Sequence, residues 1–427
     1  MSGGSRDDVR AQRKTPCGAH QLPDPGAGAI ARGCTVSGGA RPRILVLSYT
    51  RTEQEPRLLK QIAEFARRGF HVTTAGYGPK PALVDEHVEL DPLPSARGFG
   101  RVPGIFSLLL LLRLHALYAR LEPRDLAAYA RLSGEAWDVV VAHDAQTLHV
   151  AERLAPRFGV LADMHEYAPK QSLPSLRWNL LDGPYFTWLC RRYAARAAAV
   201  TTVSSGIVDE YRREFGIDAT LVVNATPYQE LEVRPIGSPI RLVHSGGVSP
   251  QRRLDIMIEG VRRSSADVTL DLYLVSEPTP LLAELMALAE GEPRIRFRDA
   301  VPYDELVRTL NEYDVGLSIF PPTTFNLAWC LPNKFFDFVQ ARLGVIVGPS
   351  PEMERFVNEY GIGEVLPDFE AASLAAALDA LTGARATEWK MASSRHVRDL
   401  SGEEQGKIWG DVVATMLAAS PQRSSVK

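Results

Sequence analysis

The sequence predicts an α/β protein made of two doubly wound domains, each with a parallel sheet covered by helices. From residue 42 onward, short apolar runs typical of buried parallel strands alternate with helix-like stretches. The alternation occurs twice, on either side of a segment that bears proline and glycine. The chain has 427 residues, about three times the ~150 of an average domain, and 45% of them are hydrophobic, which is enough for two cores.

The first alternation predicts a domain over residues 41–226. Its strands are expected at 43–48, 71–75, 138–142, 160–162, 199–203 and 221–223. Between the first two, Pro56 suits a first helical turn, Leu58, Ile62 and Phe65 recur at helical spacing, and Gly69 suits the end of the helix. A strand, a helix and a second strand within ~30 residues form a βαβ unit, so the sheet is expected to be parallel.

A linker over residues 227–239 separates this domain from a second one over 240–400. The second set of strands is expected at 240–244, 270–275, 295–297, 315–319 and 345–347. A last helix is expected within 403–420, and its periodicity does not show which domain it packs on. Ligands bind at the carboxyl ends of strands in such sheets, so the two domains are expected to face each other across a cleft.

Composition excludes several classes of protein. The formal net charge of −3 provides no basic field for nucleic acid. The four cysteines form no Cys-x-x-Cys pair, which argues against a disulfide scaffold or a cysteine zinc site and predicts a cytoplasmic protein. Residues 1–40 are rich in Gly, Arg, Ser and Pro without periodicity, and they predict a disordered leader outside the fold.

The most apolar segment, residues 105–117, is too short to cross a bilayer, for which ~20 apolar residues are needed. Arg101, Arg113 and Arg120 lie in or beside it. One interpretation is a core helix or a flap over the cleft. The other is a surface that touches lipid, which would place the protein peripherally at the inner face of a membrane.

Three nucleotide-binding motifs are missing. The first strand is not followed by the glycine-rich loop of a dinucleotide-binding fold, and the chain contains no P-loop. It also contains no Asp-x-Asp, which weakens the case for a metal-held nucleotide sugar. We therefore predict no metal ion and no cofactor.

A phosphate-binding turn is predicted at the start of the second domain. The strand ending at His244 continues into Ser245-Gly-Gly-Val-Ser-Pro-Gln-Arg-Arg253 and then into a helix. Gly246 and Gly247 would let backbone amides approach an anion, and Arg252 or Arg253 would add forked donors beside the helix N-terminus. The alternative is a tight turn with solvated arginines.

A second cation is expected in Leu331-Pro-Asn-Lys-Phe-Phe-Asp337. Asn333 begins a helix, so Lys334 lies in the first turn, where it opposes the helix dipole unless an anion is bound nearby. Asp337 lies one turn further on and could accept hydrogen bonds from ribose hydroxyls. The alternative is a surface Lys–Asp pair.

Titratable side chains close two strands of the first domain. His143 ends one strand, and Asp163, His165 and Glu166 end the next. Groups at strand ends beside a cleft are candidates for acid–base chemistry or for handling a substrate. A metal site of His143, His165 and Glu166 is conceivable, although the spacing is not that of a typical ligand set.

Together these stretches resemble a GT-B glycosyltransferase, most closely the retaining family 4 group of bacterial polysaccharide and glycolipid enzymes. The resemblance rests on four stretches: Glu55-Pro-Arg-Leu-Leu59 with Arg68-Gly-Phe-His-Val72, Trp137 to Asp144 with Asp163-Met-His-Glu166, residues 245–253, and residues 331–337. It covers nearly everything from residue 43 to about residue 417. It implies two Rossmann-like domains, with the last helix crossing back to the first.

The resemblance also implies roles for individual residues. Arg252 falls on the family's diphosphate-binding lysine, and Lys334 would be a second diphosphate contact. Asp337 falls on the second glutamate of an E-x7-E motif that holds the ribose. His165 falls in the acceptor-side D-x-H-E stretch. The first glutamate of E-x7-E falls on Trp329, so the usual carboxylate beside the transferred sugar is replaced.

The function that the resemblance implies is transfer of a sugar from a nucleotide-diphosphate sugar to a hydroxyl group, with retention and without a metal. The acceptor could be a glycan, a lipid-linked molecule or a small molecule. Two alternatives are a GT-B sugar-nucleotide epimerase and a non-catalytic partner that binds a nucleotide sugar or glycan.

Overall fold

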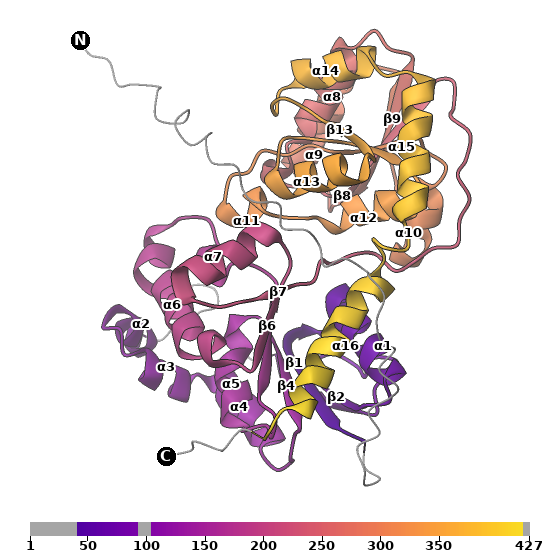
Figure 1. The fold of residues 1–427 in the computed structure, drawn as a ribbon. Coiled ribbons are helices and arrows are strands. Elements are labelled where there is room, and N and C mark those ends of the chain that lie inside the picture. The colour runs from indigo at the N-terminus through magenta and orange to yellow at the C-terminus, as the bar shows by residue number, and fades with distance from the viewer. Residues whose placement is uncertain (1–40, 93–103, 422–427) are drawn as a thin grey trace, which may run out of the picture. The chain divides into compact units, whose positions relative to one another are not determined.

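The computed structural model describes residues 41–92 and 104–421, which form two parallel α/β sheets (Figure 1). The leader predicted over residues 1–40 and Arg101 lie outside the described residues. The predicted fold class, two doubly wound parallel-sheet domains, is confirmed. Each domain is called a lobe below.

The first lobe contains a seven-stranded sheet in the order β3-β2-β1-β4-β5-β6-β7, with every pair of neighbours parallel. Its strands are β1 Arg43–Arg51, β2 His71–Tyr77, β3 Glu86–Glu89, β4 Val139–His143, β5 Val160–Met164, β6 Ala199–Thr202 and β7 Thr220–Leu221. The strand expected at 221–223 is therefore shorter and begins one residue earlier. β3 was not predicted, because its polar, half-exposed sequence carries no apolar run.

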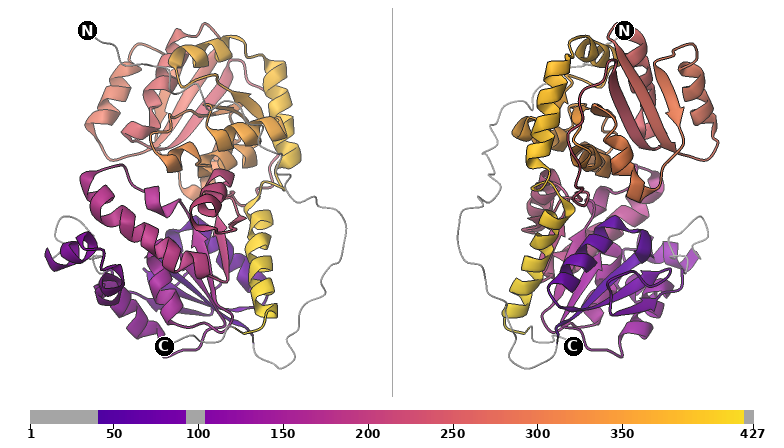
Figure 2. Two further views of the ribbon diagram at one scale, coloured as in Figure 1. Left: turned by 60° about the vertical axis from the view of Figure 1, so that its left-hand side comes forward. Right: turned by 90° about the vertical axis from the view of Figure 1, so that its right-hand side faces the viewer.

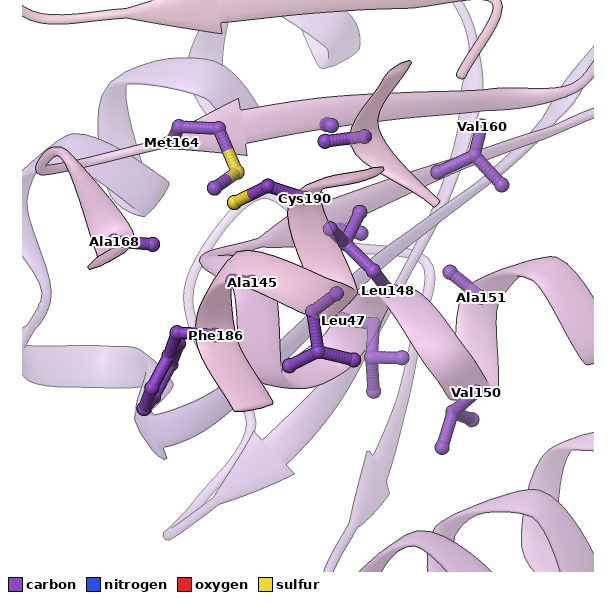
Figure 3. Close-up of a cluster of buried hydrophobic side chains, with 14 of the residues drawn as sticks. Leu47, Ala145, Leu148, Val150, Ala151, Val160, Met164, Ala168, Phe186 and Cys190 are labelled. Atoms are coloured by element: carbon purple, nitrogen blue, oxygen red, sulfur yellow. The ribbon is translucent and has the colours of Figure 1, made fainter. Parts of the chain in front are cut away.

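Seven helices belong to this part of the described chain: α1 Pro56–Arg67, α2 Gly104–Leu111, α3 His115–Leu121, α4 Pro123–Leu132, α5 Leu148–Arg153, α6 Gly183–Arg192 and α7 Ser205–Phe215. α1 forms because Glu55 caps it, Pro56 occupies its first turn, and its apolar stripe faces the sheet. A core of side chains from β1, β4, β5, α5 and α6 fills the other face, including Leu47, Leu148 and Met164 (Figure 3).

The second lobe contains a six-stranded parallel sheet in the order β10-β9-β8-β11-β12-β13. Its strands are β8 Ile240–Gly247, β9 Val268–Val275, β10 Ile295–Arg298, β11 Val315–Ser318, β12 Gly344–Val347 and β13 Gly363–Val365. Its helices are α8 Leu254–Arg263, α9 Pro280–Leu288, α10 Tyr303–Leu310, α11 Phe325–Ala328, α12 Asn333–Gln340, α13 Pro351–Tyr360, α14 Ala371–Asp379 and α15 Gly383–His396. Helices cover both faces of this sheet (Figure 2).

The last helix, α16 Gly402–Ala418, packs against α1 of the first lobe. Trp409, Val413 and Met416 enter the core that α1 shares with β1 and β4 (Figure 1). At the surface, Arg68 donates to the carboxylate of Asp411 at 2.7 Å. Periodicity alone left open which lobe this helix covers, and these contacts supply the answer.

The strand orders place a topological switch point between β1 and β4 and another between β8 and β11. At a switch point, the connections leave neighbouring strands in opposite directions and open a crevice at their carboxyl ends. His143 ends β4, and Gly246 and Gly247 end β8. The predicted site residues therefore lie where this architecture places its ligands.

Candidate functional site

Two neighbouring cavities contain most of the predicted site residues. The first, called the cation cavity, has a volume of 380 Å³ and is lined by Ser245, Gly246, Gly247, Arg252, Lys334 and Asp337 among others. The second, called the histidine cavity, has a volume of 460 Å³ and is lined by His165, Glu166, Arg57, Asn326 and others. Arg252, Pro332 and Asn333 line both, so the two cavities adjoin.

Lys334 lies in the first turn of α12 and is only 8% exposed. Its Nζ lies 3.0 Å from Nε2 of His244, whose Nδ1 lies 2.8 Å from the carbonyl oxygen of Leu317. The carbonyl can only accept, so Nδ1 carries the proton and Nε2 accepts from the lysine. Burial and the nearby charge of Arg252 lower the pKa of Lys334 to about 7. Within the described ranges, Lys334 forms no ion pair.

Arg252 ends the short 3-10 turn Pro250–Arg252 and supplies the second cation. Its guanidinium carbon lies 5.1 Å from the centre of the Phe320 ring. The Nη1 atom is buried and has no hydrogen-bond partner among the residues that the structure describes. A buried donor on a permanent cation carries a desolvation cost unless it is paired, so this atom is suited to bind an anion.

Gly246 brings the backbone close to Lys334. Its φ of +140° disfavours any other residue, and a Cβ there would lie 2.7 Å from the lysine Nζ. The turn therefore needs glycine for two independent reasons, conformation and space. Gly247 also lines the cavity, with only Val275 near the position of an added Cβ.

The other predicted residues of the second lobe, Arg253, Asn333 and Asp337, differ in whether they line a cavity. Arg253 lines neither cavity, and its guanidinium donates to the carboxylate of Asp255 at 2.8 Å. Asn333 lines both cavities. Asp337 lines the cation cavity but is 3% exposed and accepts a hydrogen bond from Thr226 at 2.6 Å. Because Lys334 and Asp337 are both buried, they are not the surface pair that was the alternative.

Burial favours the protonated, neutral form of Asp337. Burial raises the pKa of this carboxyl group to about 6, although Thr226, Lys60 and Lys334 act in the opposite direction. Asparagine 224, in the segment that joins the lobes, donates to Oδ1 of Asn333 at 2.8 Å. The connection between the lobes is therefore bonded to both ends of the first turn of α12.

A buried network centred on Asp163 organises the histidine cavity. Asp163 is fully buried, and Arg57 donates to both of its oxygens, at 2.9 and 2.6 Å. Gln61 and Thr201 donate to the same carboxylate at 2.8 and 2.6 Å. Burial alone would raise the pKa of Asp163, but the Arg57 guanidinium, together with His165 and His143, holds that pKa well below the usual range.

This network determines the protonation of the two histidines. The Gln61 amide donates to Asp163, so its oxygen accepts from Nε2 of His143 at 2.9 Å. Nδ1 of His143 is then an acceptor for Nε2 of His165, also at 2.9 Å. Burial lowers the pKa of His143 to about 3, which keeps that ring neutral.

His165 has the opposite character. Burial disfavours its charged form, but the carboxylates of Asp144 and Asp163 outweigh burial and raise its pKa to about 9. Its Nδ1 lies 3.6 Å from Oδ2 of Asp144, and its backbone N–H donates to Oδ1 of the same residue at 3.1 Å. At neutral pH His165 is therefore a cation and a hydrogen-bond donor rather than a base.

Two further features mark this end of β4 and β5. Asp144 has a φ of +62°, an uncommon backbone conformation for a residue other than glycine, and such strain is often found at functional sites. Desolvation, together with the charge of Asp144, raises the pKa of Glu166 to about 7. Glu166 thus changes its charge in the physiological range.

His143, Asp163 and His165 also satisfy a distance test for a metal site, because one ligand atom from each lies within 4.8 Å of the others. The donor set does not fit a cation well. Both oxygens of Asp163 already accept from the guanidinium of Arg57, which would repel a divalent ion bound at the same carboxylate. The third residue of the conceivable metal set, Glu166, is not part of the cluster.

Trp329 packs against the first lobe. A Cβ on Gly206, at the start of α7, would lie 2.0 Å from an atom of the Trp329 ring, so this glycine makes room for the indole. Nearby, Oδ1 of Asn326 accepts from the N–H of Tyr167 at 2.8 Å. The position that carries a glutamate in the resembling family is therefore used here for contact between the lobes.

Sequence reasoning missed Arg57 and Gln61. Both fall on the face of α1 that carries Leu58, Ile62 and Phe65, which is the buried face. Polar residues within an apolar helical stripe are a signal for a buried network, because buried polar groups need partners. No comparable signal existed for Asn326, whose partners, backbone groups of residues 167 and 170 and the carboxylate of Glu166, are distant in the sequence.

Part of the sequence that forms this site is similar to a known protein family, the glycosyl transferase 4-like domain. Residues 52–227 match the family described by that name. These residues make up most of the first lobe. This lobe contains Arg57, His143, Asp163, His165 and Glu166, and the expectation of a glycosyltransferase is confirmed by the match. Curated proteins yield no match to the sequence.

Solved structures extend the likeness beyond the glycosyl transferase 4-like domain to the whole GT-B fold. HepE from Anabaena, in complex with UDP, has a TM-score of 0.63 at 12% identity, covering 87% of this chain and 100% of that one. Sucrose-phosphate synthase from Thermosynechococcus elongatus has a TM-score of 0.62 at 15% identity, covering 89% and 100%. WaaG, a glycosyltransferase involved in lipopolysaccharide biosynthesis, has a TM-score of 0.59 at 12% identity, covering 87% and 99%.

Proposed function

We propose that this protein transfers a sugar from a nucleotide-diphosphate sugar to a hydroxyl group, retaining the anomeric configuration and requiring no metal ion. The observation that carries the proposal is the cation cavity. Lys334 and Arg252 line it together, Lys334 forms no ion pair in the described part of the chain, and Arg252 holds a buried donor without a partner there. A diphosphate supplies the negative charge and the acceptor oxygens that these groups lack.

The leaving group is the diphosphate. As the anomeric C–O bond breaks, negative charge builds on the phosphate oxygens, and Arg252, Lys334 and the amides after β8 would stabilise it. Donors aimed at developing charge act mainly in the transition state, and removal of one typically costs roughly 3 kcal/mol, or about a hundredfold in rate. The two cations and the N-terminus of α12 supply the positive charge that a divalent metal would otherwise provide.

The acceptor would bind in the histidine cavity. Because His165 is protonated at neutral pH, it can donate to an acceptor or sugar oxygen but cannot take a proton. In a retaining reaction of this kind, the leaving phosphate itself receives the acceptor proton. His165 and Glu166 would therefore orient the acceptor, and a general base is not needed from this lobe.

The nucleoside would occupy the part of the cation cavity lined by Tyr273, Val275, Ala300 and Val301. HepE is known in complexes with UDP and with UDP-glucose, which supports a uridine diphosphate sugar as the first donor to test. Thermal-shift measurements with UDP-, GDP- and dTDP-sugars would rank the candidates, since a ligand that binds only the folded state raises its melting temperature.

The matched pair Arg252 and Arg253 offers the sharpest test. Both are arginines in the same turn, but only Arg252 lines the cavity, whereas Arg253 pairs with Asp255. We expect Arg252→Gln to lower turnover of the preferred donor by about a hundredfold. Arg253→Gln should stay within about twofold of the unaltered protein. Equal losses in both variants would remove the proposed phosphate site.

Three outcomes distinguish the alternative functions and the metal-free scheme. Conversion of the donor without an acceptor would indicate an epimerase. Tight binding of donor, without hydrolysis or transfer to any of a panel of hydroxyl acceptors, would indicate a binding partner. Activity that disappears when a chelator is added, and returns with a divalent ion, would contradict the metal-free mechanism.

A further inference from the structure

The first lobe carries an unusual concentration of exposed apolar side chains, which we call the leucine surface. It consists of α2, α3, the start of α4 and residues 173–180. Its exposed members are Ile105, Leu108, Leu111, Leu112, Leu114, Leu117, Leu121, Leu126, Leu173, Leu176 and Leu180. Large exposed apolar patches are rare on soluble proteins and mark sites of contact with a partner or a membrane.

The exposure is not a consequence of poor packing. In α3, the face formed by His115, Tyr118 and Ala119 is buried against aromatic side chains of α6. Leu117 and Leu121 lie on the other face and are 45% and 44% exposed. A helix that is apolar on both faces is usually buried on both, so the exposed face of α3 is suited to contact with apolar groups from outside this chain.

The pieces of the leucine surface are joined in space. Nη1 of Arg113, at the break between α2 and α3, donates to the carbonyl oxygen of Leu180 at 2.7 Å. Leu180 belongs to the turn Trp178–Asp182, which also contacts α2. Leu173, at the other end of this segment, lines the histidine cavity as well, so the surface reaches the edge of the candidate site.

The exposed charges within the segments that form the leucine surface are basic, although Arg131 pairs with Asp91 and Arg191 with Glu214 from outside them. In residues 104–132 and 171–196, the acidic residues are Glu122, Asp125 and Asp182, and all three are buried. The same ranges expose seven arginines: Arg113, Arg120, Arg131, Arg177, Arg191, Arg192 and Arg196. The protein as a whole has a net charge of −3, so this basic rim is a local feature.

A cavity of 620 Å³ opens beside the surface. It is lined by two tryptophans and two arginines, among others: Trp178, Trp188, Arg113 and Arg191. Tryptophan is favoured at the boundary between hydrocarbon and water, and arginine pairs with phosphate through forked hydrogen bonds. This combination suits a phosphate headgroup whose acyl chains lie among the neighbouring leucines.

We propose that the leucine surface is a membrane-binding face that recognises anionic phospholipid. The leucines of α2, α3 and residues 173–180 would enter the outer part of the hydrocarbon layer, and the arginine rim would contact the headgroups. Binding of this kind needs both apolar area and attraction to anionic lipid. No helix in the described ranges is long and apolar enough to span a bilayer, so contact would be limited to one leaflet. The proposal does not depend on the identity of the sugar donor.

Flotation with vesicles tests this directly. The full chain is mixed with vesicles of phosphatidylcholine alone, or of phosphatidylcholine with phosphatidylglycerol, and the bound fraction is measured at low and high salt. We expect strong binding only to vesicles that contain phosphatidylglycerol, weakened by salt because the charges are screened. Leu112→Gln with Leu117→Gln should weaken binding by about tenfold for each leucine. Arg120→Gln with Arg192→Gln should weaken it by about fivefold for each arginine.

The matched control is Met286→Gln with Met391→Gln, which replaces exposed apolar side chains on α9 and α15 of the other lobe and should leave binding unchanged. The thermal shift caused by a nucleotide sugar reports folding and donor binding separately in every variant. The proposal is overturned if the unaltered protein ignores both kinds of vesicle, or if the leucine variant binds as well as it does. It is also overturned if the protein self-associates and the leucine variant is monomeric, which would make the surface an interface between copies.

Discussion

At the scale of single residues, one lysine and one arginine of the candidate site, Lys334 and Arg252, form no ion pair in the described structure. Most of the lysines and arginines in residues 41–92 and 104–421 pair with a carboxylate, as Arg253 does with Asp255 and Arg241 does with Asp314. Lys334 instead pairs with a neutral histidine, and Arg252 retains a buried free donor in the described structure. Such groups destabilise the unliganded protein, and an anion that binds between them relieves that cost.

The depressed pKa of Lys334 predicts that donor binding depends on pH. In the free protein its pKa is about 7, and a bound diphosphate would raise it by favouring the charged form. As the pH rises above about 7, the free protein loses this proton while the complex keeps it, so affinity for UDP-glucose should fall by up to about tenfold per pH unit. Calorimetric titrations in buffers of different ionisation enthalpy would show proton uptake. Lys334→Met should bind weakly and without this pH dependence.

The buried Arg57–Asp163 pair predicts a large effect on stability. Arg57→Met leaves a fully buried carboxylate without its cation, and we expect the free energy of unfolding to fall by about 3–5 kcal/mol. Arg212→Met removes an exposed partner of Asp218 and should have a much smaller effect, because solvent screens an exposed ion pair. Urea unfolding of both variants gives the comparison. If both variants lose equally little free energy of unfolding, the Arg57–Asp163 pair does not hold the buried network together.

At the scale of elements, the turn after β8 is the most demanding piece of local structure. It must end a strand, bring backbone amides to the cavity and leave room for Lys334 from α12. Glycine at position 246 meets these conditions, because φ is +140° and Lys334 Nζ lies where a Cβ would be.

Gly246→Ala should therefore damage binding more than folding. We expect donor affinity to fall by at least about tenfold, because the added methyl group displaces the lysine head and strains the turn. Gly291→Ala is a suitable comparison, since Gly291 also has a positive φ of +78° but has open space at the Cβ position. That variant should lose stability without losing affinity. Unchanged donor affinity in Gly246→Ala would contradict the geometry of the turn.

The elements also show what sequence patterns can predict. Buried parallel strands such as β1 and β4 are continuous apolar runs, and they were located to within a few residues. β3 and β13 were missed, because an edge strand with polar, half-exposed residues has no such signature. Lys334 and Arg252 were predicted from their positions after strands and in a first helical turn. Arg57, Gln61 and Asn326 were not, because their partners are brought together only by the tertiary fold.

At the scale of the whole molecule, the chain passes between the lobes twice. Residues 222–239 lead from β7 to β8, and α16 returns to cover α1 after the second lobe is complete. Trp409 of α16 is fully buried, lies 4.5 Å from the Arg57 guanidinium and donates to Asp163 at 3.4 Å. α16 therefore supports the network around Asp163 that sets the charge of His165, although the helix is distant in sequence from both residues.

Trp409→Ala should accordingly affect both stability and the histidine cavity. Loss of a buried tryptophan typically costs about 3–5 kcal/mol, and the cavity that remains would loosen Arg57. We expect a lower melting temperature and a higher pKa of His165, because the charge of Arg57 disfavours the protonated ring; NMR titration of the ring can follow the shift. Thr415→Ala, on the exposed side of the same helix, should change neither. A destabilised variant with an unaltered His165 pKa would separate α16 from the site.

The most direct test of the central claim is a crystal structure of the protein with UDP or an unreactive UDP-sugar. We expect the diphosphate to lie in the cation cavity, with its oxygens within hydrogen-bond distance of Arg252 Nη1 and Lys334 Nζ and of the backbone after β8. A diphosphate bound elsewhere, or one held by other side chains while Arg252 and Lys334 keep their present positions, would contradict it.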